Sequence, residues 1–129
     1  NPRVRSLSEE IARVYRSRVI NPKWIAGVMR HGYKGAFELA ATVDYLFAYD
    51  ATTNCVEDFM YEGIAHAYLL DETVQQFIRQ KNPWALRDIA ERLLEAVQRG
   101  LWQGADRSLL DQLEAIVLAA EADVENKLI

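Results

Sequence analysis

The sequence predicts an all-α domain, a compact bundle of six to seven helices in orthogonal and antiparallel packing, with no sheet. Apolar residues recur three and four positions apart through most of the 129 residues, and no stretch of any length alternates as a strand does. All three prolines directly follow an asparagine, and we place two of them, Pro22 and Pro83, at helix starts, where this arrangement is typical. A chain of this size fits one domain with a substantial core.

The first two helices are indicated by their starts. Ser6 with Glu9 matches a capping box, and the apolar residues that follow at helical spacing predict a helix over residues 7–19. Asn21 has the side-chain oxygen needed to cap a second helix, which we expect to end near His31.

The third and fourth helices are expected on either side of a loop. Helical periodicity resumes over residues 35–49, and residues 50–54 have the composition of a loop. Asn54 begins a second capping box, with Glu57 as its acidic member. The apolar face that follows predicts a helix ending near Leu70.

Three more helices complete the predicted bundle. Asp71 is placed to cap a short helix, and Asn82 repeats the start signal before a longer helix with a strong apolar stripe. Gly100 is a plausible stop for that longer helix, and a last helix is expected over residues 106–125.

Composition limits the classes of function. The net charge is −4, and the basic residues are interspersed with acidic ones, so no nucleic-acid partner is expected. A single cysteine, Cys55, fits a reducing compartment, and we expect a cytoplasmic location. No apolar run approaches the ~20 residues of a membrane span. Because the chain begins with Asn1 rather than methionine, we expect residues 1–129 to be one domain of a longer chain.

The stretch from Asn21 to Glu38 draws most of the functional interest. Gly32 and Gly35 allow a helix to stop, turn and restart, which brings a cation, an imidazole, a phenol and a carboxylate near one point. The alternative is a buried elbow whose glycines serve close packing and whose polar residues satisfy the helix ends. The candidate substrate-binding or interface residues are Trp24, Arg30, His31, Tyr33, Lys34, Glu38 and Tyr45.

A second stripe on the predicted third helix is half polar and half aromatic. It consists of Glu38, Thr42, Tyr45 and Tyr49. Such a stripe suits an interface or the wall of a pocket, and it equally suits an amphipathic rim of the core.

Several kinds of chemistry are not indicated. The sequence has no phosphate-binding glycine loop, no nucleophile elbow and no zinc-ligand spacing. Glu62 and His66 share a helix face, but they suit a surface pair better than a metal site. We therefore assign no metal ligand, no bound cofactor and no catalytic residue from these patterns.

Five segments together resemble the C-terminal end of the large subunits of the CobN and magnesium chelatase family. The resemblance runs from about Val19 to Trp102, and the first segment is specific; the helix after Gly104 is closer to the magnesium-type ending. The segments are residues 21–38, 40–48, 82–86, 93–96 and 99–102.

This resemblance implies a multi-subunit, ATP-dependent metal chelatase. The expected substrate is a tetrapyrrole, a corrin precursor of the hydrogenobyrinic acid a,c-diamide type, into which cobalt is inserted. The expected partners are the remainder of the large subunit and two ATPase-type subunits, and the full complex is expected to use ATP, magnesium and cobalt. The isolated piece is expected to be inactive.

Three alternatives remain open at this point. One is the activity of the magnesium-type large subunit of the same family, which inserts magnesium into protoporphyrin IX. Another is a non-catalytic helical docking domain for the ATPase subunits. The last is a free-standing helical protein that binds a tetrapyrrole.

Overall fold

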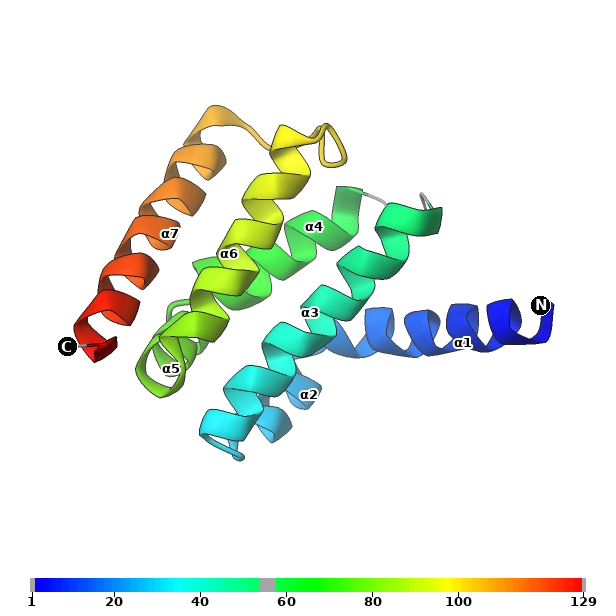
Figure 1. The fold of residues 1–129 in the computed structure, drawn as a ribbon, viewed down its shortest axis with the longest axis horizontal. Helices are drawn as coiled ribbons and strands as arrows, with labels where there is room; N and C mark the ends of the chain where they lie inside the picture. The colour runs from blue at the N-terminus through cyan, green and yellow to red at the C-terminus, as the bar shows by residue number, and fades with distance from the viewer. Residues whose placement is uncertain (1, 54–57, 129) are drawn as a thin grey trace.

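The computed structural model describes residues 2–53 and 58–128, without the side chains of 2–9, 12, 49–53, 58 and 59. The described residues form helices, turns and short connections and contain no strand, which confirms the predicted all-α class (Figure 1). The elements are α1 (Pro2–Val19), α2 (Pro22–Met29), α3 (Tyr33–Thr53), α4 (Asp58–Ile64), the π-helix η1 (Ala65–Leu70), α5 (Glu72–Lys81), α6 (Pro83–Gln98) and α7 (Arg107–Leu128).

Side-chain caps define several helix starts, as the sequence predicts. Asn21 Oδ1 accepts a hydrogen bond from the Lys23 backbone N–H at 2.9 Å. Asp71 and Asn82 cap α5 and α6 in the same way, at 3.1 Å and 3.2 Å. Each cap satisfies a backbone donor that has no partner within its helix.

Three predicted boundaries are wrong. Helix α1 begins at Pro2, so Ser6 lies inside the helix rather than at its cap. Helix α3 begins at Tyr33 instead of residue 35 and continues through residues 50–53, which were expected to be loop. That segment holds Asp, Ala and Thr but no glycine or proline, and these residues oppose helix only weakly. The second capping box, at Asn54, lies outside the described residues.

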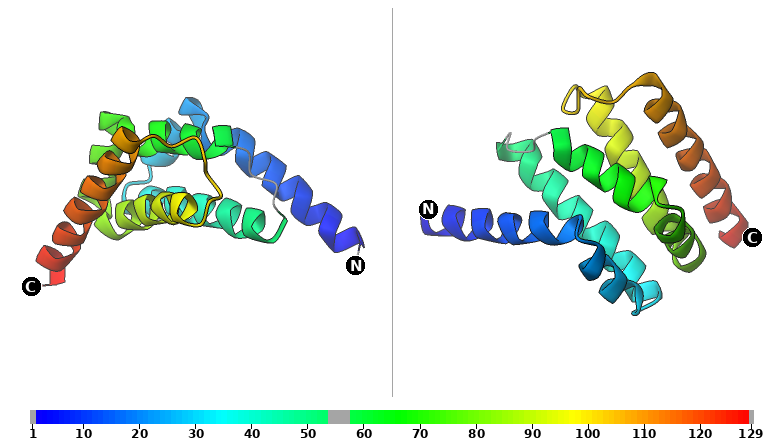
Figure 2. Two further views of the ribbon diagram at one scale, coloured as in Figure 1. Left: turned by 90° about the horizontal axis from the view of Figure 1, so that it is seen from above. Right: turned by 180° about the vertical axis from the view of Figure 1, so that it is seen from behind.

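The helices form two layers with an arm at one side. Helices α3 and α6 run side by side in the same direction, and α7 packs antiparallel to α6 (Figure 1). Helices α2, α4 and η1 form the second layer, α5 leads from this layer to the start of α6, and the N-terminal part of α1 extends away from the bundle (Figure 2). The starts of α3 and α6 therefore lie at the same end of the bundle.

Two glycines shape the turn between α2 and α3. Gly32 has a φ of +60°, a left-handed conformation that glycine adopts without steric cost. At Gly35 a Cβ atom would lie 2.1 Å from the carbonyl oxygen of Val28, so only glycine fits there without a shift. Close packing at this turn therefore sets where α3 begins.

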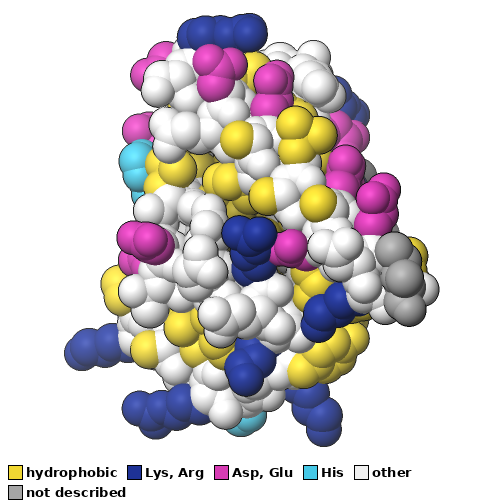
Figure 3. Space-filling model, turned by 90° about the vertical axis from the view of Figure 1, so that its left-hand side faces the viewer, with side chains coloured by type: hydrophobic (Ala, Val, Ile, Leu, Met, Phe, Trp, Pro, Cys, Tyr) yellow, Lys and Arg dark blue, Asp and Glu magenta, His cyan; other side chains and the backbone are white. Residues whose placement is uncertain are grey.

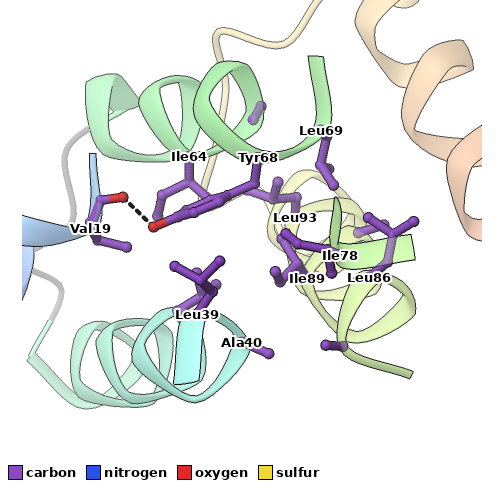
Figure 4. Close-up of a cluster of buried hydrophobic side chains, with 14 of the residues drawn as sticks. Val19, Leu39, Ala40, Ile64, Tyr68, Leu69, Ile78, Leu86, Ile89 and Leu93 are labelled. Atoms are coloured by element: carbon purple, nitrogen blue, oxygen red, sulfur yellow. Dashed lines mark hydrogen bonds between the residues drawn. The ribbon is translucent and has the colours of Figure 1, made fainter. Parts of the chain in front are cut away.

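The core centres on the π-helix. Tyr68 is fully buried, and its hydroxyl donates a hydrogen bond to the carbonyl oxygen of Val19 at the end of α1 (Figure 4). Leu39, Ile64 and Leu93 from three other elements surround it (Figure 4). Burial raises the pKa of the Tyr68 phenol above its ordinary value, so the hydroxyl stays protonated and acts as a donor.

Candidate functional site

The ionisable residues predicted at the helix junction lie on the surface. Arg30, His31, Lys34 and Glu38 are all exposed, and Tyr33 is 59% exposed. The buried-elbow alternative predicts close packing at the glycines, and this packing is present. It also predicts that the polar side chains are used at the helix ends, but these side chains face solvent. On the face shown in Figure 3, Lys and Arg side chains gather at the lower end, where the α2–α3 junction lies.

Within the half-aromatic stripe of α3, Tyr45 contacts α1 rather than the junction, and the side chain of Tyr49 lies outside the described residues. The ring of Tyr45 packs edge-on against Tyr15 of α1, with centroids 5.0 Å apart at 70°. The buried Thr42 hydroxyl donates to the Glu38 carbonyl oxygen at 2.8 Å. Trp24 is partly buried against the core. Tyr45 and Trp24 therefore do not join the exposed residues of the junction.

A groove lies between the first halves of α3 and α6, and we call it the aromatic groove. It has a volume of about 260 Å³ and a floor that includes three alanines, whose small side chains leave room. Its other lining residues are Tyr33, Phe37 and Asp44 from α3, Trp84 and Asp88 from α6, and the cap Asn82.

The rim of the aromatic groove exposes large apolar surface. Tyr33, Phe37 and Trp84 are 59%, 61% and 36% exposed. They are three of the six large hydrophobic residues that are exposed in the described part of the chain. A local concentration of this kind is typical of an interaction surface.

Two carboxylates lie together along the same groove. The Nε of Arg92 donates to Asp44 Oδ1 at 3.1 Å and lies 3.8 Å from Asp88 Oδ1. Partial burial, followed by the hydrogen bond and the negative charge of Asp44, raises the pKa of Asp88 to about 7, although Arg92 opposes the shift. Near neutral pH the Asp88 carboxyl is therefore only partly ionised.

Of the residues that line this groove, only Tyr33 is among the candidates predicted from the sequence. Phe37 and Asp44 lie four and eleven residues after Tyr33 on one face of α3, and Trp84 and Asp88 share a face of α6. These spacings can be read from the sequence. The parallel contact between α3 and α6, which brings the two faces together, cannot.

No metal centre is found among the described residues, where no three acidic, histidine or cysteine side chains are grouped to hold an ion. Glu62 and His66 form the expected exposed pair, with 3.7 Å between Oε1 and Nε2. In the same part of the chain, no helix is both long and apolar enough to cross a membrane.

The family model described as CobN/Magnesium Chelatase matches residues 1–109. The chain belongs to this family. It is 63% identical over 115 residues to the aerobic cobaltochelatase subunit CobN of Pseudomonas aeruginosa, covering 88% of this chain and 9% of that protein. The CobN subunit of a Sinorhizobium species is 57% identical over 119 residues, covering 92% of this chain and 9% of that protein.

A solved CobN-family structure has the same fold. The catalytic subunit of cobaltochelatase from Mycobacterium tuberculosis superposes with a TM-score of 0.82 at 54% identity, over 90% of this chain and 10% of that chain. Family members named as magnesium-chelatase subunits are more distant, at 30–40% identity. The chain spans about a tenth of the length of the relatives it matches.

Proposed function

We propose that this chain is the C-terminal part of the large subunit of a cobaltochelatase, which inserts cobalt into a corrin precursor of the hydrogenobyrinic acid a,c-diamide type. The observation that carries the proposal is the 63% identity over 115 residues to a CobN subunit. Members named for magnesium are at most 40% identical among the relatives compared. Cobalt is therefore favoured over magnesium.

The complex that we propose has further parts. The rest of the substrate cavity lies in the remainder of the large subunit, and two ATPase-type subunits couple ATP hydrolysis, with magnesium, to insertion. We place this complex in the cytoplasm. The 129 residues are not catalytic by themselves in this proposal, because they span only about a tenth of the length of the relatives.

Within that complex the α2–α3 junction is the part of this chain that we assign to the substrate. Corrin precursors carry carboxylates and amides around the ring, and exposed cations bind such groups by charge-assisted hydrogen bonds. Arg30 and Lys34 supply the cations, and His31 between them is a donor or acceptor near neutral pH. Tyr33 adds an exposed ring that suits stacking on a macrocycle.

An absorption titration of the full-length subunit tests the choice of substrate. Hydrogenobyrinic acid a,c-diamide and protoporphyrin IX are added in separate titrations, and the change in each macrocycle's absorption bands gives its dissociation constant. The proposal predicts tighter binding of the corrin precursor. Tighter binding of protoporphyrin IX would favour the magnesium-type alternative. A large subunit that binds neither macrocycle but captures the ATPase subunits would favour the docking-domain alternative.

A further inference from the structure

The aromatic groove is separate in its chemistry from the cationic junction beside it. Its rim is aromatic and its charged lining residues are two aspartates, whereas the junction presents Arg30 and Lys34. A corrin precursor that carries carboxylates is repelled by aspartates. We therefore expect the groove to bind something other than the corrin precursor.

Its size also argues against a whole macrocycle. A volume of about 260 Å³ is below the roughly 300–1,000 Å³ of pockets that enclose small ligands. It is large enough for one or two side chains. Exposed aromatic residues of this kind are typical anchors at protein–protein contacts.

The charges in the groove match a cationic side chain. Arg92 contacts both carboxylates from one side, and it is a single cation opposite two acids. Glu91 adds negative charge near Asp88. The Nζ of Lys127 lies 6.0 Å from the ring centroid of Trp84, a distance at which the ring of an aromatic side chain attracts a cation.

We propose that the aromatic groove is the docking site for an arginine- or lysine-bearing segment from the remainder of the same large subunit. The cation of that segment lies against Asp44 and Asp88, and its apolar part packs on Phe37 and Trp84. This inference rests on the proposed function, because the segment belongs to the remainder of the large subunit. The relatives of this chain are about ten times longer than it, which leaves room for such a segment. The inference assigns to the groove, apart from Tyr33 at its junction end, an interdomain role that is separate from substrate binding.

Oxidative footprinting of the full-length subunit tests the inference. Hydroxyl radicals label exposed aromatic side chains, and mass spectrometry gives the labelling rates of Phe37 and Trp84. Exposed Leu118 on α7 serves as the internal reference. We expect both aromatic residues to be labelled more slowly than their exposed fractions in this structure predict. This protection should be present in the large subunit alone, without macrocycle, ATP or partner subunits.

Charge variants test the chemistry of the occupant. The Asp44→Asn/Asp88→Asn double variant should raise labelling of Phe37 and Trp84 by about fivefold or more, because the docked cation loses its counter-charge. Asp111→Asn, an equivalent change at an exposed site on α7, is the matched control and should leave labelling unchanged. Circular dichroism verifies that each variant keeps its helix content.

Each other outcome overturns the inference. If Phe37 and Trp84 are labelled as fast as fully exposed side chains, the groove is open. If they are protected and the double variant does not change this protection, the occupant is not basic. Protection only with added corrin precursor would make the groove a substrate site. Protection that increases with protein concentration would indicate a second copy. Cobalt insertion, measured separately, decides the proposed function whatever the footprinting shows.

Discussion

The Tyr68 hydroxyl of η1 donates a hydrogen bond to the backbone carbonyl oxygen of Val19, the last residue of α1. The last carbonyls of a helix have no intrahelical partner, so this bond satisfies one of them inside the core. It also joins two elements 49 residues apart in the sequence. The π-helix is therefore part of what holds the extended α1 on the bundle.

Removing this hydroxyl should destabilise the fold without changing its shape. In Tyr68→Phe the ring remains but the Val19 carbonyl loses its donor in a dry environment. We expect the free energy of unfolding to fall by about 1–3 kcal/mol. Urea denaturation followed by circular dichroism measures the change. A variant as stable as the parent chain would show that the bond contributes nothing net.

Gly35 should tolerate no larger residue. In Gly35→Ala the added Cβ would lie 2.1 Å from the Val28 carbonyl oxygen, so the backbone of the turn must move. We expect a loss of about 1–3 kcal/mol in the free energy of unfolding. Gly27→Ala is the control, because a Cβ atom at that position would have nothing within 4 Å and the site is helical. That control should gain about 0.5–1 kcal/mol, and equal effects at both sites would refute the packing argument.

Asp88 should make stability depend on pH. Its pKa is about 7 in the folded chain, above the ordinary 3.8, so the folded state favours the protonated form. The stabilising contribution is complete below about pH 4 and is lost as the pH rises through 7. Asp44, Glu91 and Arg92 are the charged groups that act on it.

Asp88→Asn removes that dependence. The stability of the variant relative to the parent chain should rise between about pH 4 and pH 7, because only in the parent does the folded state hold this proton more tightly than the unfolded state. Urea midpoints at several pH values measure it. We expect this change in stability to be small, because the Asp88 carboxyl is partly exposed. If the parent chain instead became more stable relative to the variant as the pH rises, the predicted direction would be wrong.

His31 should matter for cobalt insertion in the complete complex. We expect His31→Ala to lower kcat/KM by about tenfold or more if the imidazole exchanges protons with the bound macrocycle, while helix content stays unchanged. The other histidine supplies the control, because His66 is exposed on η1 and pairs only with Glu62 among the described residues. Unchanged turnover in His31→Ala, or an equal loss in His66→Ala, would remove the assignment.

The local features of the fold were predictable because each is encoded within a few residues. Asn21, Asp71 and Asn82 cap the helices that their sequence patterns indicate. Boundaries without glycine or proline were less predictable, as the extension of α3 through Thr53 shows. A helix of that length depends on packing rather than on the preference of its last residues.

The aromatic groove was not predictable from spacing alone. Phe37 and Trp84 lie far apart in the sequence, and each belongs to a face that an isolated helix would simply leave in solvent. Their meeting depends on α3 and α6 running in the same direction, which is a property of the whole bundle.

A metal-insertion assay tests the central proposal most directly. The full-length subunit that contains this chain is combined with its two ATPase partners, ATP and either cobalt with hydrogenobyrinic acid a,c-diamide or magnesium with protoporphyrin IX. We predict ATP-dependent formation of the cobalt product and no magnesium porphyrin. Magnesium porphyrin without a cobalt product would contradict the account.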